Sequence, residues 1–202
     1  MPELTEDKWK NIAKGFNNRA NFPYCLGAID GSYGRCSDST IFEESILYEK
    51  LQQKTLKIPA PENSVPYIFV GDEAFSISKS VMRPYAGKQL SVAKRIFNYR
   101  LSRARRFIEC SFGILANKWR IFHRPIDHKP KYAKEIIKAC CVLHNFVRER
   151  DGYNFEDTLT QPLENIIIDS DERNRSSPEG IRFFFTDYFM NEGKLEWQMN
   201  MI

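Results

Sequence analysis

Apolar positions recur every three or four residues in five stretches of the chain, and this spacing predicts amphipathic helices. The stretches cover residues 5–18, 41–53, 91–119, 132–150 and 177–193. Thr5 and Ser91 stand at the start of two of them, where a hydroxyl side chain can accept a hydrogen bond from the first helical turn. Pro178 suits the first turn of the last helix, because a proline there has no N–H to leave unsatisfied.

The longest stretch has the clearest apolar stripe. Its members step along the chain by 4, 3, 4, 4, 3 and 4 positions: Phe97, Leu101, Ala104, Ile108, Phe112, Leu115 and Trp119. This regularity predicts one long helix with a continuous buried face. Glu109 stands inside this helix, four positions after Arg105 and three after Arg106.

Three shorter segments are typical of strands. Residues 24–29 and 67–70 are short apolar runs, and residues 120–126 are a third candidate that contains a terminating proline. The first run leads directly into Asp30, and the second leads through one glycine into Asp72. Strands that alternate with helices predict an α/β fold.

Composition divides the chain into three parts. Residues 149–179 carry nine acids against three basic residues, together with Pro, Asn and Ser, which is typical of a linker. We therefore expect residues 1–150 to form one α/β domain and residues 151–177 to be an acidic linker. Residues 178–202 should add a C-terminal helix that packs on the same domain. An apolar content of 42% and an aromatic content of 13% support a packed core.

Charge is distributed unevenly along the chain. Residues 83–131 carry thirteen Lys and Arg against two acids, which is a net charge of +11, whereas the whole chain carries +4. The rest of the chain is therefore acidic. A basic block in an otherwise acidic protein indicates a polyanionic partner such as nucleic acid, although a solvated basic helix face has the same composition.

Other features narrow the class of protein. The five cysteines form no Cys-x-x-Cys pair, and no stretch approaches the roughly 20 apolar residues of a membrane span. The charged N-terminal residues do not form the apolar core of a signal peptide. These features predict an intracellular protein with reduced thiols and no membrane partner.

Cys140, Cys141 and His144 share a helix turn, but their apolar neighbours favour a core helix over a metal site.

Isolated carboxylates at strand ends suggest metal chemistry. Asp30 and Asp72 would meet at one sheet edge if their strands were parallel neighbours, and Glu109 could approach from the long helix. Carboxylate oxygens suit Mg²⁺ or Mn²⁺, and two such ions serve phosphodiester cleavage. The simpler alternatives are that each aspartate caps a turn and that Glu109 forms an ion pair with the arginines one turn before it.

Several long motifs together resemble the nuclease domain of PIF/Harbinger transposases and their domesticated derivatives. They are, in order, FPYCLGAIDG, VGDEAF, MRPYAGKQL, RIFNYRLSRARRFIECSFGILANKWRIF and IIKACCVLHNFVRERDG. This family belongs to the DDE superfamily and has a ribonuclease H-like fold. The resemblance implies that Asp30, Asp72 and Glu109 are the three catalytic, metal-binding acids. It also implies that Asp38 is a candidate auxiliary ligand, with a loop cap as the alternative role.

The chain departs from the family pattern in two respects. Only 41 residues separate Asp30 from Asp72, and they contain none of the alternating strands that follow the first acid in the family. The sheet is therefore expected to be shortened and to leave an edge beside the Asp30 strand. The family's N-terminal helix-turn-helix region has no counterpart here. DNA targeting would then fall to the basic helix or to a separate DNA-binding protein.

Three hypotheses follow. The first is a nuclear, Mg²⁺- or Mn²⁺-dependent endonuclease, present also in the cytoplasm, whose phosphate contacts are Lys94, Arg100, Arg103 and Arg106. The second is a catalytically dead remnant that binds DNA or protein. The third is a fragment without a stable fold.

Overall fold

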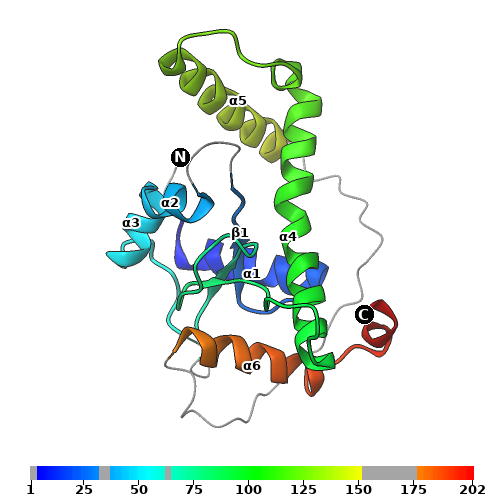
Figure 1. Ribbon diagram of the computed structural model, residues 1–202. Coiled ribbons are helices and arrows are strands. Elements are labelled where there is room, and N and C mark those ends of the chain that lie inside the picture. The colour runs from blue at the N-terminus through cyan, green and yellow to red at the C-terminus, as the bar shows by residue number, and fades with distance from the viewer. Residues whose placement is uncertain (1–3, 32–36, 62–64, 152–176) are drawn as a thin grey trace. The chain divides into compact units, whose positions relative to one another are not determined.

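The computed structural model describes residues 4–31, 37–61, 65–151 and 177–202 (Figure 1). The chain divides into two compact units. The larger unit holds the described residues up to Arg106 together with 177–202, and the smaller unit runs from Phe107 to Asp151. Helix α4 (Val92–Lys118) contributes its first half to the larger unit and its second half to the smaller one.

A small parallel sheet forms the centre of the larger unit. Its strands are β1 (Cys25–Ala28), β2 (Ile68–Val70) and β3 (Val81–Met82), hydrogen-bonded in that order. The two strands expected over residues 24–29 and 67–70 are confirmed. Among the described strands, β1 lies at one edge of the sheet and β3 at the other. This mixed helix-and-strand architecture is compatible with an α/β nuclease fold.

The prediction of a third strand over residues 120–126 is wrong. Residues 120–126 begin with the 3₁₀ helix η1 (Arg120–His123), in which the Phe122 N–H donates to the Trp119 carbonyl oxygen at 3.0 Å. This turn directly follows the end of α4, and residues 120–126 take no part in the described sheet. The true third strand, β3, has two residues, which is too short for a periodic pattern to reveal.

Helix α1 (Glu6–Ala20) packs against the sheet. Thr5 caps it by accepting from the Lys8 N–H at 3.4 Å, as the sequence predicted. The Trp9 ring meets the Phe69 ring edge to face at 6.1 Å, and its indole N–H donates to the Leu56 carbonyl oxygen at 2.7 Å. A single indole therefore joins the helix, the sheet and the connection that precedes β2.

The helix expected over residues 41–53 is divided into two short helices. These are α2 (Asp38–Glu43) and α3 (Ile46–Gln52). Ser45 separates them, because its side chain caps α3 by accepting from the Tyr48 N–H at 3.1 Å. The serine starts a new helix where the weak apolar stripe suggested one continuous helix.

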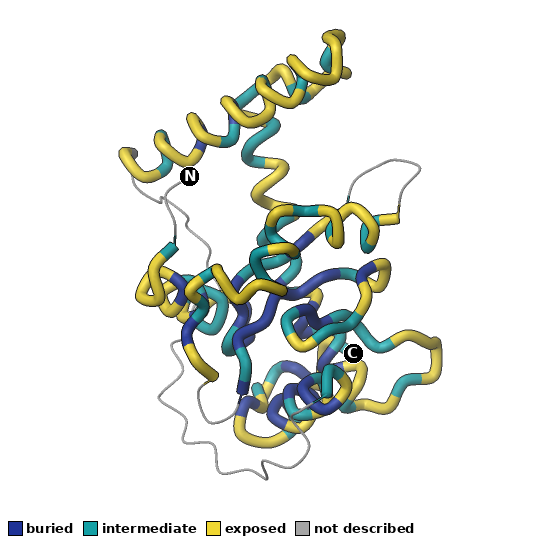
Figure 2. Tube along the Cα trace, turned by 90° about the vertical axis from the view of Figure 1, so that its left-hand side faces the viewer, coloured by how far each residue is buried: buried dark blue, intermediate teal, exposed yellow. Residues whose placement is uncertain are grey.

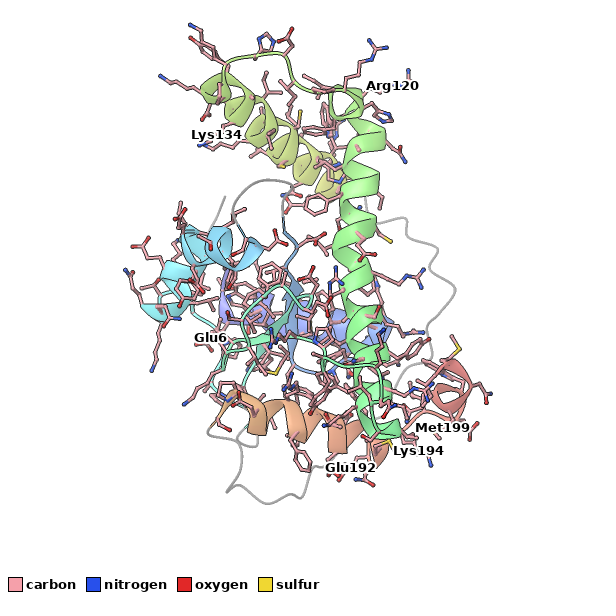
Figure 3. All side chains as sticks on the ribbon, in the orientation of Figure 1. Glu6, Arg120, Lys134, Glu192, Lys194 and Met199 are labelled. Atoms are coloured by element: carbon pink, nitrogen blue, oxygen red, sulfur yellow. The ribbon has the colours of Figure 1, made fainter. Side chains whose placement is uncertain are left out.

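An aromatic cluster holds the C-terminal helix α6 (Pro178–Met190) in the larger unit. Phe22 lies 5.3 Å from Phe185, 5.1 Å from Phe189 and 6.4 Å from Phe97, measured between ring centroids. Side chains crowd the space between the sheet, the first half of α4 and α6 (Figure 3). Ser177 caps α6, so the helix begins where the sequence placed it. The expected acidic linker falls almost entirely on residues 152–176, outside the described residues.

The smaller unit is a helical hairpin. The second half of α4, η1 and α5 (Pro130–Asp151) form it. The long apolar stripe of α4 is buried at Phe97, Leu101 and Ala104, whereas Phe112 is 51% exposed. Most of α5 is exposed too, although the sequence favoured a core helix (Figure 2). The prediction of a continuous buried face therefore holds for the first half of α4 and is wrong for the second half.

Within the described residues, no helix is both long enough and apolar enough to cross a bilayer.

The buried His144 predicts a pH dependence of stability. Its pKa is lowered by burial and, to a lesser degree, by the charges of Arg148 and Lys118. The folded state therefore resists protonation, while the unfolded state takes up a proton as the pH falls below the ordinary value of about 6.5. The contribution of the neutral His144 to the free energy of unfolding should be fully present above that pH and should decrease as the pH falls below it. Thermal melts between pH 8 and pH 5 should show a smaller loss for His144→Gln than for the wild type, whereas equal losses would contradict this assignment.

Candidate functional site

Two aspartates occupy equivalent positions past the ends of neighbouring parallel strands. Ala28 of β1 is in register with Val70 of β2, and the Ile29 N–H donates to the Val70 carbonyl oxygen at 2.8 Å. Asp30 and Asp72 each follow two residues later. The parallel pairing on which the sequence argument depended is thus present, and both aspartates lie at the carboxyl edge of the sheet, where open α/β sheets bind ligands.

The loop that carries Asp72 is fixed from two sides. The Asp72 Oδ1 accepts from the Ala74 N–H at 2.9 Å. Arg83 donates to the carbonyl oxygens of Glu73 at 3.2 Å and Phe75 at 3.3 Å. These bonds hold the aspartate in a defined turn. The positioning role of Arg83 was not recognised in the sequence, because an arginine that binds backbone carbonyls leaves no spacing pattern.

Asp30 has a cationic neighbour from the long helix. Its Oδ1 accepts from the Gly31 N–H at 3.0 Å and lies 3.7 Å from the Arg105 guanidinium. The Asp30 side chain is 27% exposed and the Arg105 side chain 20% exposed. The sequence suggested Arg105 as an ion-pair partner of Glu109, one turn away. The pairing with Asp30 crosses from sheet to helix, so local spacing could not reveal it.

Asp38 lies beside the residue that follows Asp30. It is the first residue of α2, and a Cβ added to Gly31 would overlap the Asp38 carboxyl group. Glycine is therefore the residue that lets this carboxylate approach the strand end. Residues 32–36, which join Gly31 to α2, lie outside the described residues.

Glu109 is exposed on the second half of α4, within the smaller unit, whereas Asp30 and Asp72 belong to the larger one. The three-acid site therefore stays a prediction. In residues 4–31, 37–61, 65–151 and 177–202 no group of three acidic, His or Cys side chains comes together in the way a metal ion requires. The established geometry is the pair of strand-end aspartates with Arg105.

Three of the four basic residues proposed to contact phosphates are at least partly accessible. Lys94 and Arg106 are exposed on α4. The Lys94 ammonium lies 5.0 Å from the centre of the Tyr85 ring. Arg103 is half-buried, with its guanidinium 4.7 Å from the Trp197 ring centre in the 3₁₀ helix η3 (Glu196–Met201). Lys94 and Arg106 therefore remain the clearest candidates for an electrostatic surface.

The fourth, Arg100, does not suit a phosphate contact. It is only 1% exposed and donates to the Gly193 carbonyl oxygen at 3.2 Å, to the Gln198 side chain at 3.0 Å and to the Asn21 carbonyl oxygen. Its guanidinium also lies 4.4 Å from the centre of the Phe189 ring. Burial lowers its pKa to about 10, so it stays cationic at neutral pH. The assignment of Arg100 to DNA is corrected: this arginine ties α4 to the C-terminal segment.

Comparison with known proteins adds independent information. Residues 24–145, more than half of the chain, match the family model described as DDE superfamily endonuclease. Among curated proteins, "Protein ALP1-like" from Arabidopsis thaliana is 28% identical over 144 residues, which cover 68% of this chain and 35% of the relative. The chain thus spans about a third of the length of this curated relative. No solved structure matches the chain.

Proposed function

Because the chain belongs to the DDE superfamily of endonucleases, we propose that it cleaves DNA in a divalent-metal-dependent reaction. The proposal includes a ribonuclease H-like ancestry and an origin from a PIF/Harbinger transposase. The observation that supports it most is the register of β1 and β2, which brings Asp30 and Asp72 to one sheet edge. Two carboxylates from adjacent strand ends form an oxygen-rich edge, which is the donor type that Mg²⁺ and Mn²⁺ prefer.

Asp30, Asp72 and Glu109 are the proposed ligands, with Asp38 as an auxiliary one. When bound, such ions activate a water molecule and stabilise the leaving oxygen of a phosphodiester. The protein's own contribution is to fix the acids: the turn at Ala74 holds Asp72, and the Gly31 N–H holds Asp30. Arg105 balances the charge of Asp30 and is suited to attract a phosphate to the same edge.

Glu109, in helix α4, is included in the proposal because it stands at the position of the third acid in the family that the chain resembles. This helix runs without interruption from Val92 to Lys118. Arg105 and Glu109 are four residues apart, so they share one helix face. Arg105 pairs with Asp30, and both of these residues belong to the larger unit.

The exposed basic residues of α4 are proposed to bind the DNA backbone. Replacing Lys94 and Arg106 with alanine should weaken binding to duplex DNA. With fewer phosphates neutralised by the protein, binding releases fewer counterions from the DNA. The slope of log affinity against log salt should become shallower by about 0.9 for each lost contact. Fluorescence anisotropy at several salt concentrations measures this slope. Lys10→Ala, at an exposed position of α1, is the control, and an unchanged slope in the α4 variant would contradict the proposal.

The nucleus is the proposed location, with a further pool in the cytoplasm, because the substrate is DNA. A separate DNA-binding protein is the proposed source of sequence targeting.

A second candidate function is a catalytically inactive module that binds DNA or protein. It is favoured by the sheet, in which β1 is an edge strand, and by the lack of a three-ligand group in the described part of the chain. One experiment separates the two functions: the folded wild type is incubated with supercoiled plasmid in Mg²⁺, in Mn²⁺ and in EDTA. Nicking that requires metal supports the endonuclease. Salt-sensitive binding without nicking supports the inactive module.

A further inference from the structure

Helix α5 carries an exposed apolar stripe that borders its buried face. Its members step along the helix by 4, 3, 4 and 3 residues: Tyr132, Ile136, Ala139, Leu143 and Phe146. We call this set the α5 stripe. Tyr132 is 60% exposed, Leu143 47% and Phe146 58%. Alternating steps of four and three are the spacing with which one helix packs along another.

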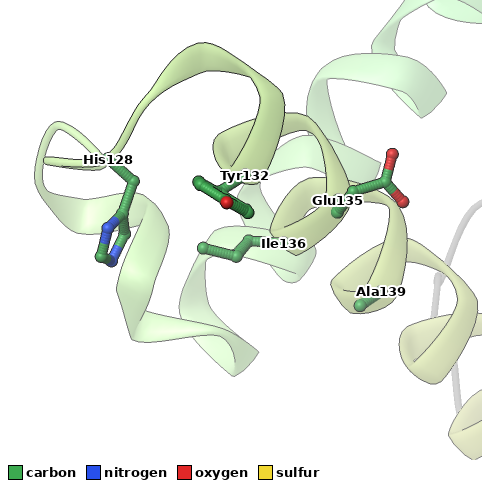
Figure 4. Close-up of a pocket in the computed structure, with 5 residues that line it drawn as sticks. All are labelled: His128, Tyr132, Glu135, Ile136 and Ala139. Atoms are coloured by element: carbon green, nitrogen blue, oxygen red, sulfur yellow. The ribbon is translucent and has the colours of Figure 1, made fainter.

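The buried face of α5 is formed by other residues. Cys140 and His144 are its buried members; Cys140 lies next to Ile136 and Leu143 at the border of the α5 stripe, and His144 lies farther round the helix. The stripe therefore remains accessible after the hairpin has formed. Its first half borders an open groove of about 560 Å³ (Figure 4). The residues that line this groove are His128, Tyr132, Glu135, Ile136 and Ala139.

We propose that the α5 stripe is a dimer interface in which α5 of a second copy of this chain packs antiparallel. The order of side-chain sizes along the stripe is symmetric about Ala139 to within one residue, because Tyr132 and Phe146 are each seven residues away, Ile136 three and Leu143 four. A two-fold axis at Ala139 would bring Tyr132 opposite Phe146 of the second copy and Ile136 opposite Leu143. Aromatic residues then meet at both ends, branched aliphatic residues meet between them, and the two alanines allow the helices to approach closely at the centre.

Charges at the border of the stripe fit the same arrangement. Lys131 and Glu149 are exposed near opposite ends of α5, on the same side of the stripe. The two-fold axis would bring Lys131 of one copy within two residues of the level of Glu149 of the other, and symmetry repeats this pair. In a parallel arrangement, Lys131 of one copy and Glu149 of the other would lie 18 residues apart along the helices, so this pair would not form. The charges therefore favour the antiparallel pair, in which Lys131 and Glu149 come together.

The test measures the mass of the full chain by analytical ultracentrifugation at several concentrations. The wild type should be a dimer. Leu143→Lys should raise the dimer dissociation constant at least 100-fold, because it buries a charge at the interface. Ile137→Lys is the matched control: Ile137 is 42% exposed on the same helix but lies off the stripe, so this variant should remain a dimer. Far-ultraviolet circular dichroism checks that both variants fold.

A second measurement maps the contact if Leu143→Lys fails to fold. In the Ala139→Cys variant, a short bis-maleimide linker should join the new thiols of two copies, and mass spectrometry identifies the joined peptide. A monomeric wild type at tens of micromolar would overturn the proposal, since the stripe would then be covered by another part of the chain or by a different partner. A dimer that survives Leu143→Lys, or joined peptides that do not contain position 139, would overturn it as well.

Discussion

Asp72→Asn is expected to reduce metal-dependent DNA cleavage by on the order of 10³-fold, while the protein stays folded. The amide keeps the oxygen that accepts from the Ala74 N–H, so the turn after β2 should survive. What is lost is the negative charge that the proposed metal ion requires. Initial rates of plasmid nicking, measured at saturating Mg²⁺ or Mn²⁺, give the ratio directly.

The neighbouring residue provides a matched control for Asp72→Asn. Glu73 is exposed in the same turn and has no proposed role at the metal, so Glu73→Gln removes one negative charge at nearly the same place. It should retain the wild-type nicking rate within about twofold. Equal losses in the two variants would mean that general electrostatics, and not a ligand, explains the effect.

Arg100→Met should lower the free energy of unfolding by about 3 kcal/mol. The substitution keeps most of the apolar volume but removes the donors to the Gly193 and Asn21 carbonyl oxygens and to the Gln198 side chain. These acceptors would be left buried without donors. The free energy lost in this way exceeds the free energy gained because a charged side chain no longer has to be desolvated on folding. Urea denaturation followed by circular dichroism measures the loss.

Two further variants make the Arg100 experiment specific. Arg100→Lys should recover only part of the stability, because a single ammonium cannot reproduce the planar set of donors of a guanidinium. Arg106→Ala removes an exposed arginine from the same helix and should change stability by less than about 0.5 kcal/mol. If Arg100→Met were as stable as the wild type, the structural role assigned to Arg100 would be wrong.

The sequence predicted those parts of the fold that rest on local rules. The hydroxyl cap at Thr5, the proline at position 178 and the apolar runs that precede Asp30 and Asp72 placed these helices and strands correctly. The parallel pairing of β1 with β2 was a condition of the metal-site hypothesis, and the structure meets it.

The failures concern long-range contacts. Arg100 carries the same charge as Arg106 in the same helix, and only the approach of Gly193 and Gln198 from the C-terminus makes it structural. The apolar stripe of α4 continues through Phe112 without a change of spacing, yet it leaves the covered part of the helix at that point. Periodicity shows which face of a helix is apolar, but it cannot show whether a second element is present to cover that face.

The central claim is that Asp30, Asp72 and Glu109 act as one metal-dependent site, and Glu109→Gln tests it most directly, because Glu109 comes from the smaller unit. The measurement is nicking of supercoiled plasmid by the wild type and by Glu109→Gln, in Mg²⁺, Mn²⁺ and EDTA, after circular dichroism has shown both to be folded. We predict nicking by the wild type with either metal, none in EDTA, and a loss on the order of 10³-fold in the variant. A folded wild type that does not nick, or a variant that nicks as fast as the wild type, would contradict the claim.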